Sequence, residues 1–239
     1  METAAYVAMS RQTVLEQAME VIANNLANAS TSGFKGSEPL FRDYLQPGPG
    51  RQQIAYVRDA GSVRDIRQGD LKLTGNSLDA AIQGDGYYSV STAAGVRYTR
   101  IGSFQTTPQG LLVTASGDPV LDDRGNPITL PTTPGRIAIG TDGTIAKNGT
   151  PVGKLGVVSF ANPQQLVEES AGLYTTTAAP TPDATSRIQQ GAIEQSNIRS
   201  VVEMTRMLSV QGAYADTVQV MSAEDTRLKN AIDKLSRVA

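Results

Sequence analysis

Three aspartates recur at short intervals in the middle of the chain and are the first candidates for chemistry. Asp70, Asp79 and Asp85 could in principle ligate calcium or form the carboxylate pair of a glycosidase. Each has glycine, asparagine or serine close by, and these are the residues that turns favour. We therefore interpret the aspartates as turn residues, with a metal or glycosidase site as the alternative.

The other candidates lack the partners that catalysis requires. The chain has no His and no Cys. The commonest general base, the commonest zinc ligand and any thiolate or disulfide are therefore absent. Ser89 and Ser103 have no His to activate them. The segment Gly84-Asp85-Gly86 has neither the third glycine nor the following helix of a dinucleotide fingerprint. The sequence predicts no enzyme activity, no cofactor and no metal.

The composition argues against two further classes. The 239 residues suffice for one or two domains, and 21 basic and 23 acidic residues give a net charge of −2. A nucleic-acid protein should show a basic excess or patch, and neither is present. No stretch has the length of a membrane span. The N-terminus lacks the basic region of a secretory signal, so we expect a protein that is cytoplasmic or exported without a cleaved signal.

Residues 2–28 are predicted to form the first of two long helices. Glycine and proline are absent from residues 1–32. The segment should end near Asn28, because Ser30–Gly33 supplies helix breakers and a possible left-handed glycine cap. The apolar positions that fall at helical spacing are Ala8, Leu15, Ala18 or Met19, Ile22 and Leu26.

Residues 198–236 form the strongest predicted helix, with one glycine and no proline. Apolar residues follow a near-heptad spacing that is interrupted by Asp225. We expect this stripe, the C-terminal seam, to mediate helix packing. Its members are Met207, Val210, Tyr214, Val218, Met221, Leu228, Ile232 and Leu235.

The middle of the chain, about 60–175, alternates short apolar runs with turn dipeptides such as Asp142-Gly143 and Asn148-Gly149. This spacing predicts an antiparallel all-β domain. A Thr/Ala/Pro-rich loop or linker is expected over 175–186. The expected strands are 71–73, 78–83, 87–91, 97–100, 111–114, 128–130, 137–139 and 157–160.

The predicted fold class is α+β. Neither terminal helix can bury its apolar stripe alone, so we expect the two helices to pair as a coiled-coil-like domain. The longer C-terminal helix would leave apolar surface for other copies of the chain, as in a polymer subunit. The expected division is 1–35 as N-terminal helix and signature turn, 36–60 as an extended linker, 61–196 as the central β domain and 197–239 as the C-terminal helix.

The densest motif lies at the end of the first helix, and two interpretations are open. In one, the helix frays and is closed by Gly33, with Phe34 packing back. In the other, asparagine amides bond across subunits and fix register. Lys35 is interpreted as a cation near the helix C-terminus, close to the dipole or an acidic neighbour, rather than a nucleophile. The motif residues are Asn24, Asn25, Leu26, Ala27, Asn28, Thr31, Gly33, Phe34 and Lys35.

This motif resembles the signature of the flagellar rod, hook and hook–filament junction proteins. Further segments resemble other family motifs, in order along nearly the whole chain. The start of the chain and residues 206–232 are most similar to a proximal-rod member, although Gly212 stands where the family commonly has Arg. The further matching segments are 69–88, 98–104, 111–117 and 191–198.

The resemblance implies a structural subunit of the basal-body rod, a hollow shaft that crosses the periplasm, transmits torque and passes exported subunits. The implied partners are further copies of the chain, other proximal-rod proteins, the distal-rod protein and the flagellar type III export apparatus, with the surrounding periplasmic ring as a further neighbour. A distal-rod or hook-type protein is the alternative within the family. Outside it, the alternatives are a β-rich adhesin or tail-like protein binding through 60–175, and a periplasmic carbohydrate-active enzyme.

Overall fold

The computed structural model describes residues 2–47, 53–170 and 172–236. Two long helices and a central antiparallel β region confirm the predicted α+β class. The chain divides into two compact units. Unit 1 comprises residues 1–27, 37–64 and 199–239, and unit 2 comprises residues 28–36 and 65–198.

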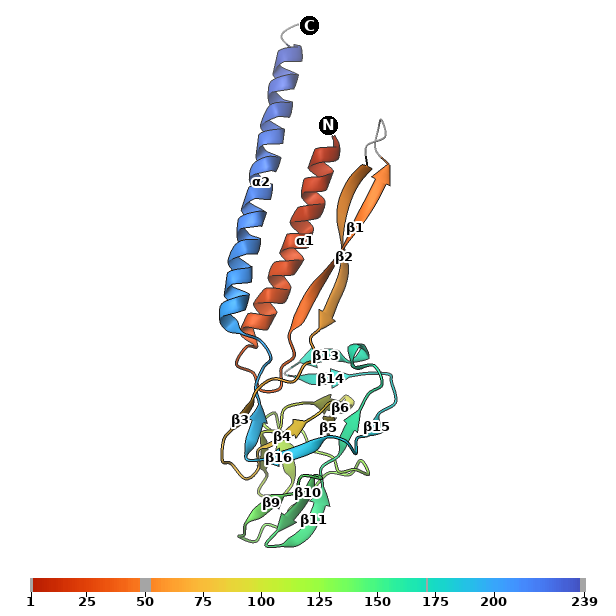
Figure 1. Cartoon of the computed structure of the whole chain (residues 1–239), viewed down its shortest axis with the longest axis vertical. Helices are drawn as coiled ribbons and strands as arrows, with labels where there is room; N and C mark the ends of the chain where they lie inside the picture. Colours follow the sequence, from red (N-terminus) through yellow and green to blue (C-terminus); the bar gives the residue numbers. More distant parts are fainter. Residues whose placement is uncertain (1, 48–52, 171, 237–239) are drawn as a thin grey trace. The chain divides into compact units, whose positions relative to one another are not determined.

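Unit 1 contains both helices and a β-hairpin. Helix α1 spans Glu2–Ala27 and α2 spans Ser200–Ser236, within two residues of the predicted bounds. Strands β1 (Ser37–Pro47) and β2 (Gln53–Arg64) pair antiparallel. Figure 1 shows α1 lying between α2 and this hairpin, and α1 contacts all three elements.

The hairpin corrects the prediction that residues 36–60 form an extended linker. That prediction rests on mixed polar residues, on Pro39 and on the run Pro47-Gly48-Pro49-Gly50, because proline cannot donate to a strand ladder. In the structure the register shifts between Pro39 and Phe41, so the proline lies at a β-bulge that tolerates it. Beyond the bulge the two strands stay in register, with Tyr44 opposite Tyr56. The hairpin tip, 48–52, lies outside the described residues.

The two helices of unit 1 run antiparallel, and α2 packs along α1. The buried face of α1 includes Val14 instead of the expected Leu15, which is only partly buried. Between the helices, the Gln12 amide donates to the Tyr214 hydroxyl at 2.7 Å, and that hydroxyl donates to Glu16 at 3.1 Å. The buried apolar residues of α1 are Ala8, Val14, Ala18 and Ile22.

Unit 2 is built from short strands whose described pairings are all antiparallel. The largest sheet has the order β13-β14-β6-β5-β12-β15, and a second has the order β11-β10-β9. The pairs β16-β4, β17-β3 and β7-β8 complete the unit, with a 3-10 helix at Pro163–Gln165. The strands are β3 (Leu71–Leu73), β4 (Ala80–Gln83), β5 (Tyr87–Thr92), β6 (Gly95–Thr99), β7 (Phe104–Thr106), β8 (Leu112–Thr114), β9 (Ile137–Ile139), β10 (Thr144–Lys147), β11 (Thr150–Lys154), β12 (Val157–Ser159), β13 (Val167–Ser170), β14 (Leu173–Thr175), β15 (Thr181–Pro182), β16 (Arg187–Gln190) and β17 (Ala192–Glu194).

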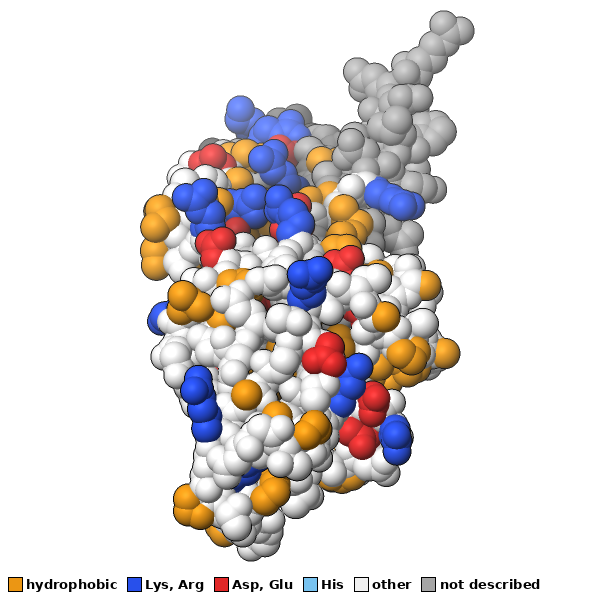
Figure 2. Space-filling view, turned by 60° about the horizontal axis from the view of Figure 1, so that its bottom comes forward, with side chains coloured by type: hydrophobic (Ala, Val, Ile, Leu, Met, Phe, Trp, Pro, Cys, Tyr) orange, Lys and Arg blue, Asp and Glu red, His pale blue; other side chains and the backbone are white. Residues whose placement is uncertain are grey.

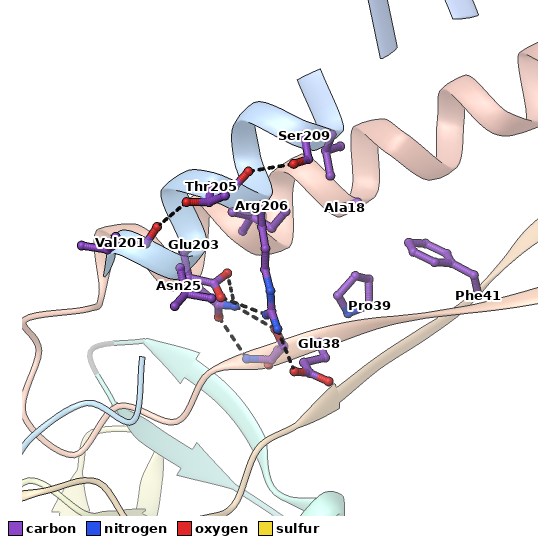
Figure 3. A pocket seen from close by; sticks show the side chains of 14 residues that line it. Ala18, Asn25, Glu38, Pro39, Phe41, Val201, Glu203, Thr205, Arg206 and Ser209 are labelled. Atoms are coloured by element: carbon purple, nitrogen blue, oxygen red, sulfur yellow. Dashed lines mark hydrogen bonds and ion pairs between the residues drawn. The ribbon is translucent and has the colours of Figure 1, made fainter. Parts of the chain in front are cut away.

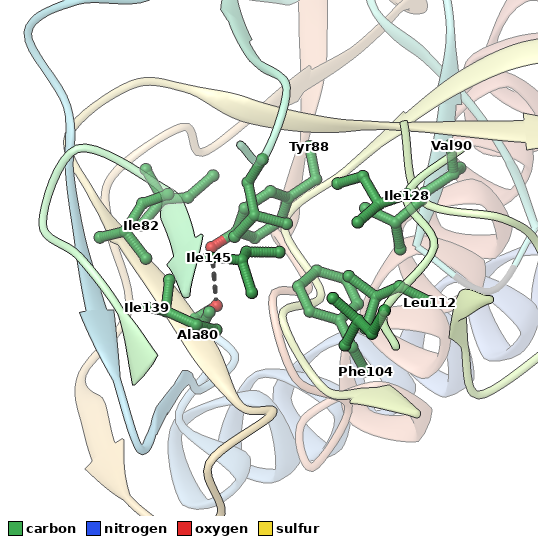
Figure 4. Close-up of a cluster of buried hydrophobic side chains, with 13 residues drawn as sticks. Ala80, Ile82, Tyr88, Val90, Phe104, Leu112, Ile128, Ile139 and Ile145 are labelled. Atoms are coloured by element: carbon green, nitrogen blue, oxygen red, sulfur yellow. Dashed lines mark hydrogen bonds between the residues drawn. The ribbon is translucent and has the colours of Figure 1, made fainter. Parts of the chain in front are cut away.

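The main core of unit 2 is centred on Tyr88, which is fully buried (Figure 4). Its hydroxyl donates to the Ala80 carbonyl at 2.8 Å, and its ring meets Phe104 edge-on at 5.1 Å. Burial raises the pKa of the Tyr88 hydroxyl. Residues 128–130, expected as a strand, make only an isolated bridge from Thr129 to Leu111, although Ile128 is buried in this core.

A second cluster of unit 2 is aromatic. Tyr87 meets Phe160 and Tyr174 edge-on, each at 5.9 Å, and Tyr98 meets Phe160 at 4.8 Å. On the face that Figure 2 shows, uncharged atoms cover most of the surface and both signs of charge are interspersed. The two cores of unit 2 together bury four tyrosines, Tyr87, Tyr88, Tyr98 and Tyr174.

Candidate functional site

A buried ion cluster forms the polar centre of unit 2. Lys35 Nζ lies 2.5 Å from Glu194 Oε1, and Arg100 Nη2 lies 2.8 Å from Glu194 Oε2. All three side chains are at most 3% exposed. The backbone N–H of Gly69 also donates to Oε1 at 3.0 Å. One carboxylate therefore holds two cations in a site that water does not reach.

The surplus positive charge of this cluster is met by backbone carbonyls. Lys35 donates to the Arg67 carbonyl at 2.8 Å, and Arg100 donates to the carbonyls of Gly84, at 2.8 Å, and Gly86. Burial lowers the pKa of Lys35, although the Glu194 carboxylate offsets part of this effect. Removing Glu194 would leave two desolvated cations without a counter-charge.

The ion cluster joins three motifs that are far apart in the sequence. Lys35 ends the signature, Arg100 belongs to Tyr98–Phe104, and Glu194 to Gly191–Ile198. The sequence suggested an acidic neighbour for Lys35, but it did not identify Glu194 or Arg100 as its partners. Three charged residues within separate matching motifs were the available signal, and no local spacing connects them.

The signature turn, residues 28–36, lies in unit 2 instead of continuing the helical domain as expected. Helix α1 ends at Ala27, and Thr31 bonds back to Asn28 through its backbone N–H (3.0 Å) and its hydroxyl (3.2 Å). Gly33 has φ +69°, which confirms the predicted left-handed glycine. Its N–H donates to the Glu194 carbonyl at 2.9 Å, and Phe34 is 2% exposed. The turn is thereby fixed to the centre of the β unit.

Substituting Gly33→Ala is expected to destabilise unit 2 by about 2–4 kcal/mol. An added Cβ would lie 2.8 Å from the Arg100 carbonyl carbon, and alanine is also strained at this φ. Gly75→Ala is the matched control, because Gly75 has φ +74° but nothing within 4 Å of an added Cβ. Denaturant unfolding followed by tyrosine near-ultraviolet circular dichroism would measure both. Equal losses of unfolding free energy for the two variants would contradict the close packing of Gly33 on Arg100.

Asn25 belongs to the signature, and its side chain is buried within unit 1. Its Nδ2 donates to the Ser37 carbonyl at 2.8 Å, and its Oδ1 accepts the Ser37 N–H at 3.0 Å. Nδ2 also lies 3.4 Å from Glu203 Oε2 on α2. This amide thus ties α1 to the hairpin and to α2 within one subunit. Of the other signature residues, Asn24 and Ala27 are exposed and Leu26 is partly buried.

Beside Asn25, unit 1 has a cavity of about 600 Å³ that is bounded by α1, β1 and α2 (Figure 3). Arg206 bridges one side of it, 2.9 Å from Glu203 and 3.6 Å from Glu38. Large exposed apolar areas are stabilised when another surface covers them. The apolar lining consists of Ala18, Ile22, Pro39, Phe41, Val201, Val202 and Val210.

The members of the C-terminal seam fall into two groups that differ in solvent exposure. Met207, Val210, Tyr214 and Met221 are partly buried. Val218, Leu228 and Ile232 are exposed, by 43%, 37% and 64%. Thr217, at 5% exposed, takes the buried position expected of Val218. A one-residue error of phase therefore accounts for the exposure of Val218. The Leu235 side chain lies outside the described residues.

The aspartates of the middle region lie at turns and strand ends. Asp79 accepts hydrogen bonds from the Thr74 hydroxyl at 2.6 Å and the Asn76 amide at 2.9 Å. The Asp70 carbonyl accepts the Gln195 N–H. Within the described residues, no three acidic side chains are grouped so that they could hold a metal ion. Neither described helix combines the length and hydrophobicity that a membrane span needs.

The chain with these two long helices, a hairpin and a β unit that contains the signature turn is similar in sequence to flagellar hook and rod proteins. Three family profiles match the chain in order. "Flagella basal body rod protein" covers residues 6–35, "Flagellar hook protein FlgE/F/G D1 domain" covers 81–147, and "Flagellar basal body rod FlgEFG protein C-terminal" covers 189–234.

Individual relatives extend the match to the whole chain. The flagellar basal-body rod protein FlgF of Caulobacter vibrioides is 36% identical over 244 residues, covering 100% of both chains. FlgF of Mesorhizobium japonicum is 35% identical and covers 98% of each chain. The rod protein FlgG of Bacillus subtilis is 30% identical, over 95% of this chain and 97% of that protein. The chain belongs to the flagellar basal-body rod protein family, and its sequence identity to these two FlgF proteins is higher than to the FlgG of Bacillus subtilis.

Proposed function

We propose that this chain is a structural subunit of the proximal rod and that it assembles through its terminal helices, paired in coiled-coil fashion. The observation that carries the proposal is the excess length of α2, which has 37 residues against 26 in α1. The contacts Gln12–Tyr214 and Asn25–Glu203 place Glu2 level with about Asp225 in the antiparallel pair. Leu228 and Ile232 therefore lie beyond the start of α1, where their exposed side chains are available to other subunits.

The proposed role is mechanical and includes no catalytic step. Family membership supports assembly with other rod proteins in the basal body. The proposed neighbours are further copies of the chain, other proximal-rod proteins and the distal-rod protein, with delivery by the flagellar export apparatus. The division into a helical core and a projecting β unit is also proposed, with the two units of the structure as its support.

Deletion of the gene tests this role directly. We expect a strain that lacks the chain to be non-motile and to yield no complete hook–basal bodies, and a plasmid copy to restore both. In the complemented strain, mass spectrometry of purified hook–basal bodies should detect the chain in the rod fraction. Wild-type swimming and intact rods in the deletion strain would contradict the proposal.

A further inference from the structure

The side chain of Asn197 lies where the chain enters and leaves unit 2. The chain passes from one unit to the other after residues 27, 36, 64 and 198. Asn197 Oδ1 accepts the Gly36 N–H at 2.9 Å. Its Nδ2 donates to the Asp65 carbonyl at 2.8 Å and lies 3.2 Å from the Arg67 carbonyl. The Asn197 amide thus bonds to the chain at two of these four crossing points and itself lies at a third. All of these contacts are within unit 2.

The same segments are also bonded directly to one another. The Asp65 N–H donates to the Gly36 carbonyl at 2.7 Å, and Lys35 Nζ donates to the Arg67 carbonyl at 2.8 Å. The Asn197 N–H completes the set by donating to the Phe34 carbonyl at 3.4 Å. The three segments therefore form a closed network instead of three separate attachments.

The chemistry of this position requires an amide. The site needs an acceptor for the Gly36 N–H and, on the same group, a donor for the Asp65 carbonyl. Asparagine supplies both from one planar group, whereas aspartate supplies only acceptors and would face a carbonyl oxygen with a charge. Alanine supplies neither.

We propose that Asn197 is a positioning residue that fastens residues 34–36, 65–67 and 196–198 into one cooperative element, here called the Asn197 clasp. When the clasp opens, all three segments open together. Because the backbones of the three segments share one set of hydrogen bonds, a mechanical force on any one segment is transmitted to the other two. This inference rests on contacts within unit 2 and does not depend on the proposed rod role.

Hydrogen exchange on the purified full-length chain tests the clasp. In Asn197→Ala, the amides of Gly36 and Asp65 should exchange about 10- to 100-fold faster, as expected for the loss of part-buried hydrogen bonds. The Asp65 amide is the critical readout, because its own partner is Gly36 and not Asn197. The core amides of Leu112 and Leu121 should keep native rates.

Two further variants complete the test. Asn197→Asp retains the acceptor for Gly36 but loses the donor, so cooperative opening predicts faster exchange at Gly36 as well. Asn162→Ala removes an ordinary side-chain bond to the Gln164 N–H elsewhere in unit 2 and should leave Gly36 and Asp65 unchanged.

Three results would overturn the clasp. Faster exchange at Gly36 alone in Asn197→Ala would show independent bonds. Native exchange rates at both amides in Asn197→Ala would show that the Asn197 side chain does not stabilise these segments. Loss of core protection in both Asn197 variants would show that the residue supports the whole unit instead of the three segments.

Discussion

Glu194→Gln is expected to lower the unfolding free energy of unit 2 by about 3–5 kcal/mol. The glutamine keeps the shape of the side chain but removes the only carboxylate that Lys35 and Arg100 share among their described ion pairs. Its amide nitrogen would also face a donor of Lys35 or of Arg100. Both cations remain buried, so their desolvation is no longer compensated.

Unit 2 can be observed separately in this experiment. The four tyrosines buried in unit 2 contribute to the near-ultraviolet signal, whereas the two long helices of unit 1 supply the helical part of the far-ultraviolet signal. With urea slopes of about 1–3 kcal/mol per molar, a loss of this size shifts the midpoint by roughly 1–5 M. The expected observation is an early loss of the tyrosine signal of unit 2 with the helical signal retained.

Glu169→Gln is the matched control, because Glu169 pairs with Arg97 in a similar two-oxygen geometry at 2.7 and 3.1 Å. The Glu169 side chain is 44% exposed, so its loss should cost less than about 1 kcal/mol. Lys35→Met combined with Glu194→Gln should cost less than the two single changes together, since the pair is coupled. If Glu194→Gln cost no more than Glu169→Gln, the cluster would not stabilise unit 2.

Leu228→Asp is expected to abolish rod assembly and motility while both units remain folded. Leu228 lies beyond the start of α1 and is 37% exposed, so a carboxylate there stays hydrated in the free subunit. In an assembled contact the same carboxylate would be buried against apolar surface, which costs several kcal/mol. The contact repeats with every subunit of a polymer, so the penalty repeats as well.

Motility in soft agar and recovery of hook–basal bodies measure the effect. Asn230→Asp is the control, since it adds a carboxylate two residues away, on another face of the same exposed helix. The strain that carries Asn230→Asp should swim normally. Circular dichroism of the purified Leu228→Asp variant should match the native spectrum. Normal swimming of this variant would show that Leu228 does not contact a neighbour, and would leave family membership unaffected.

Several features were accessible from the sequence because they depend on local order. The bounds of both helices follow from the lack of proline and the 3.6-residue period, and Gly33 follows from the need for a left-handed residue after a helix. Strands such as Leu71–Leu73 and Ile137–Ile139 were bounded by turn dipeptides. The hairpin over 37–64 was missed because its prolines, such as Pro39 and Pro47, are typical of a linker.

The phase of the C-terminal seam shows the limit of pattern reasoning. A helix with apolar residues on more than one side offers several stripes, and Val218 fits the heptad spacing as well as Thr217 does. Only the packing of α2 on α1 selects Thr217 for burial. Leu228 and Ile232, which the same pattern assigned to the seam, are exposed for another reason, because α2 is longer than α1, and these are the residues that the proposed assembly uses.

By itself, the sequence determined the helices, the β character of the middle region and the family, because period, turn chemistry and ordered motifs are properties of neighbouring residues. The tertiary structure alone decided that Lys35 meets a carboxylate 159 residues away and that Asn25 ties α1 to the hairpin. It also decided that one amide, Asn197, gathers three chain passages. Such pairings are set by how the chain folds back on itself, and burial then makes each of them too costly to leave unsatisfied.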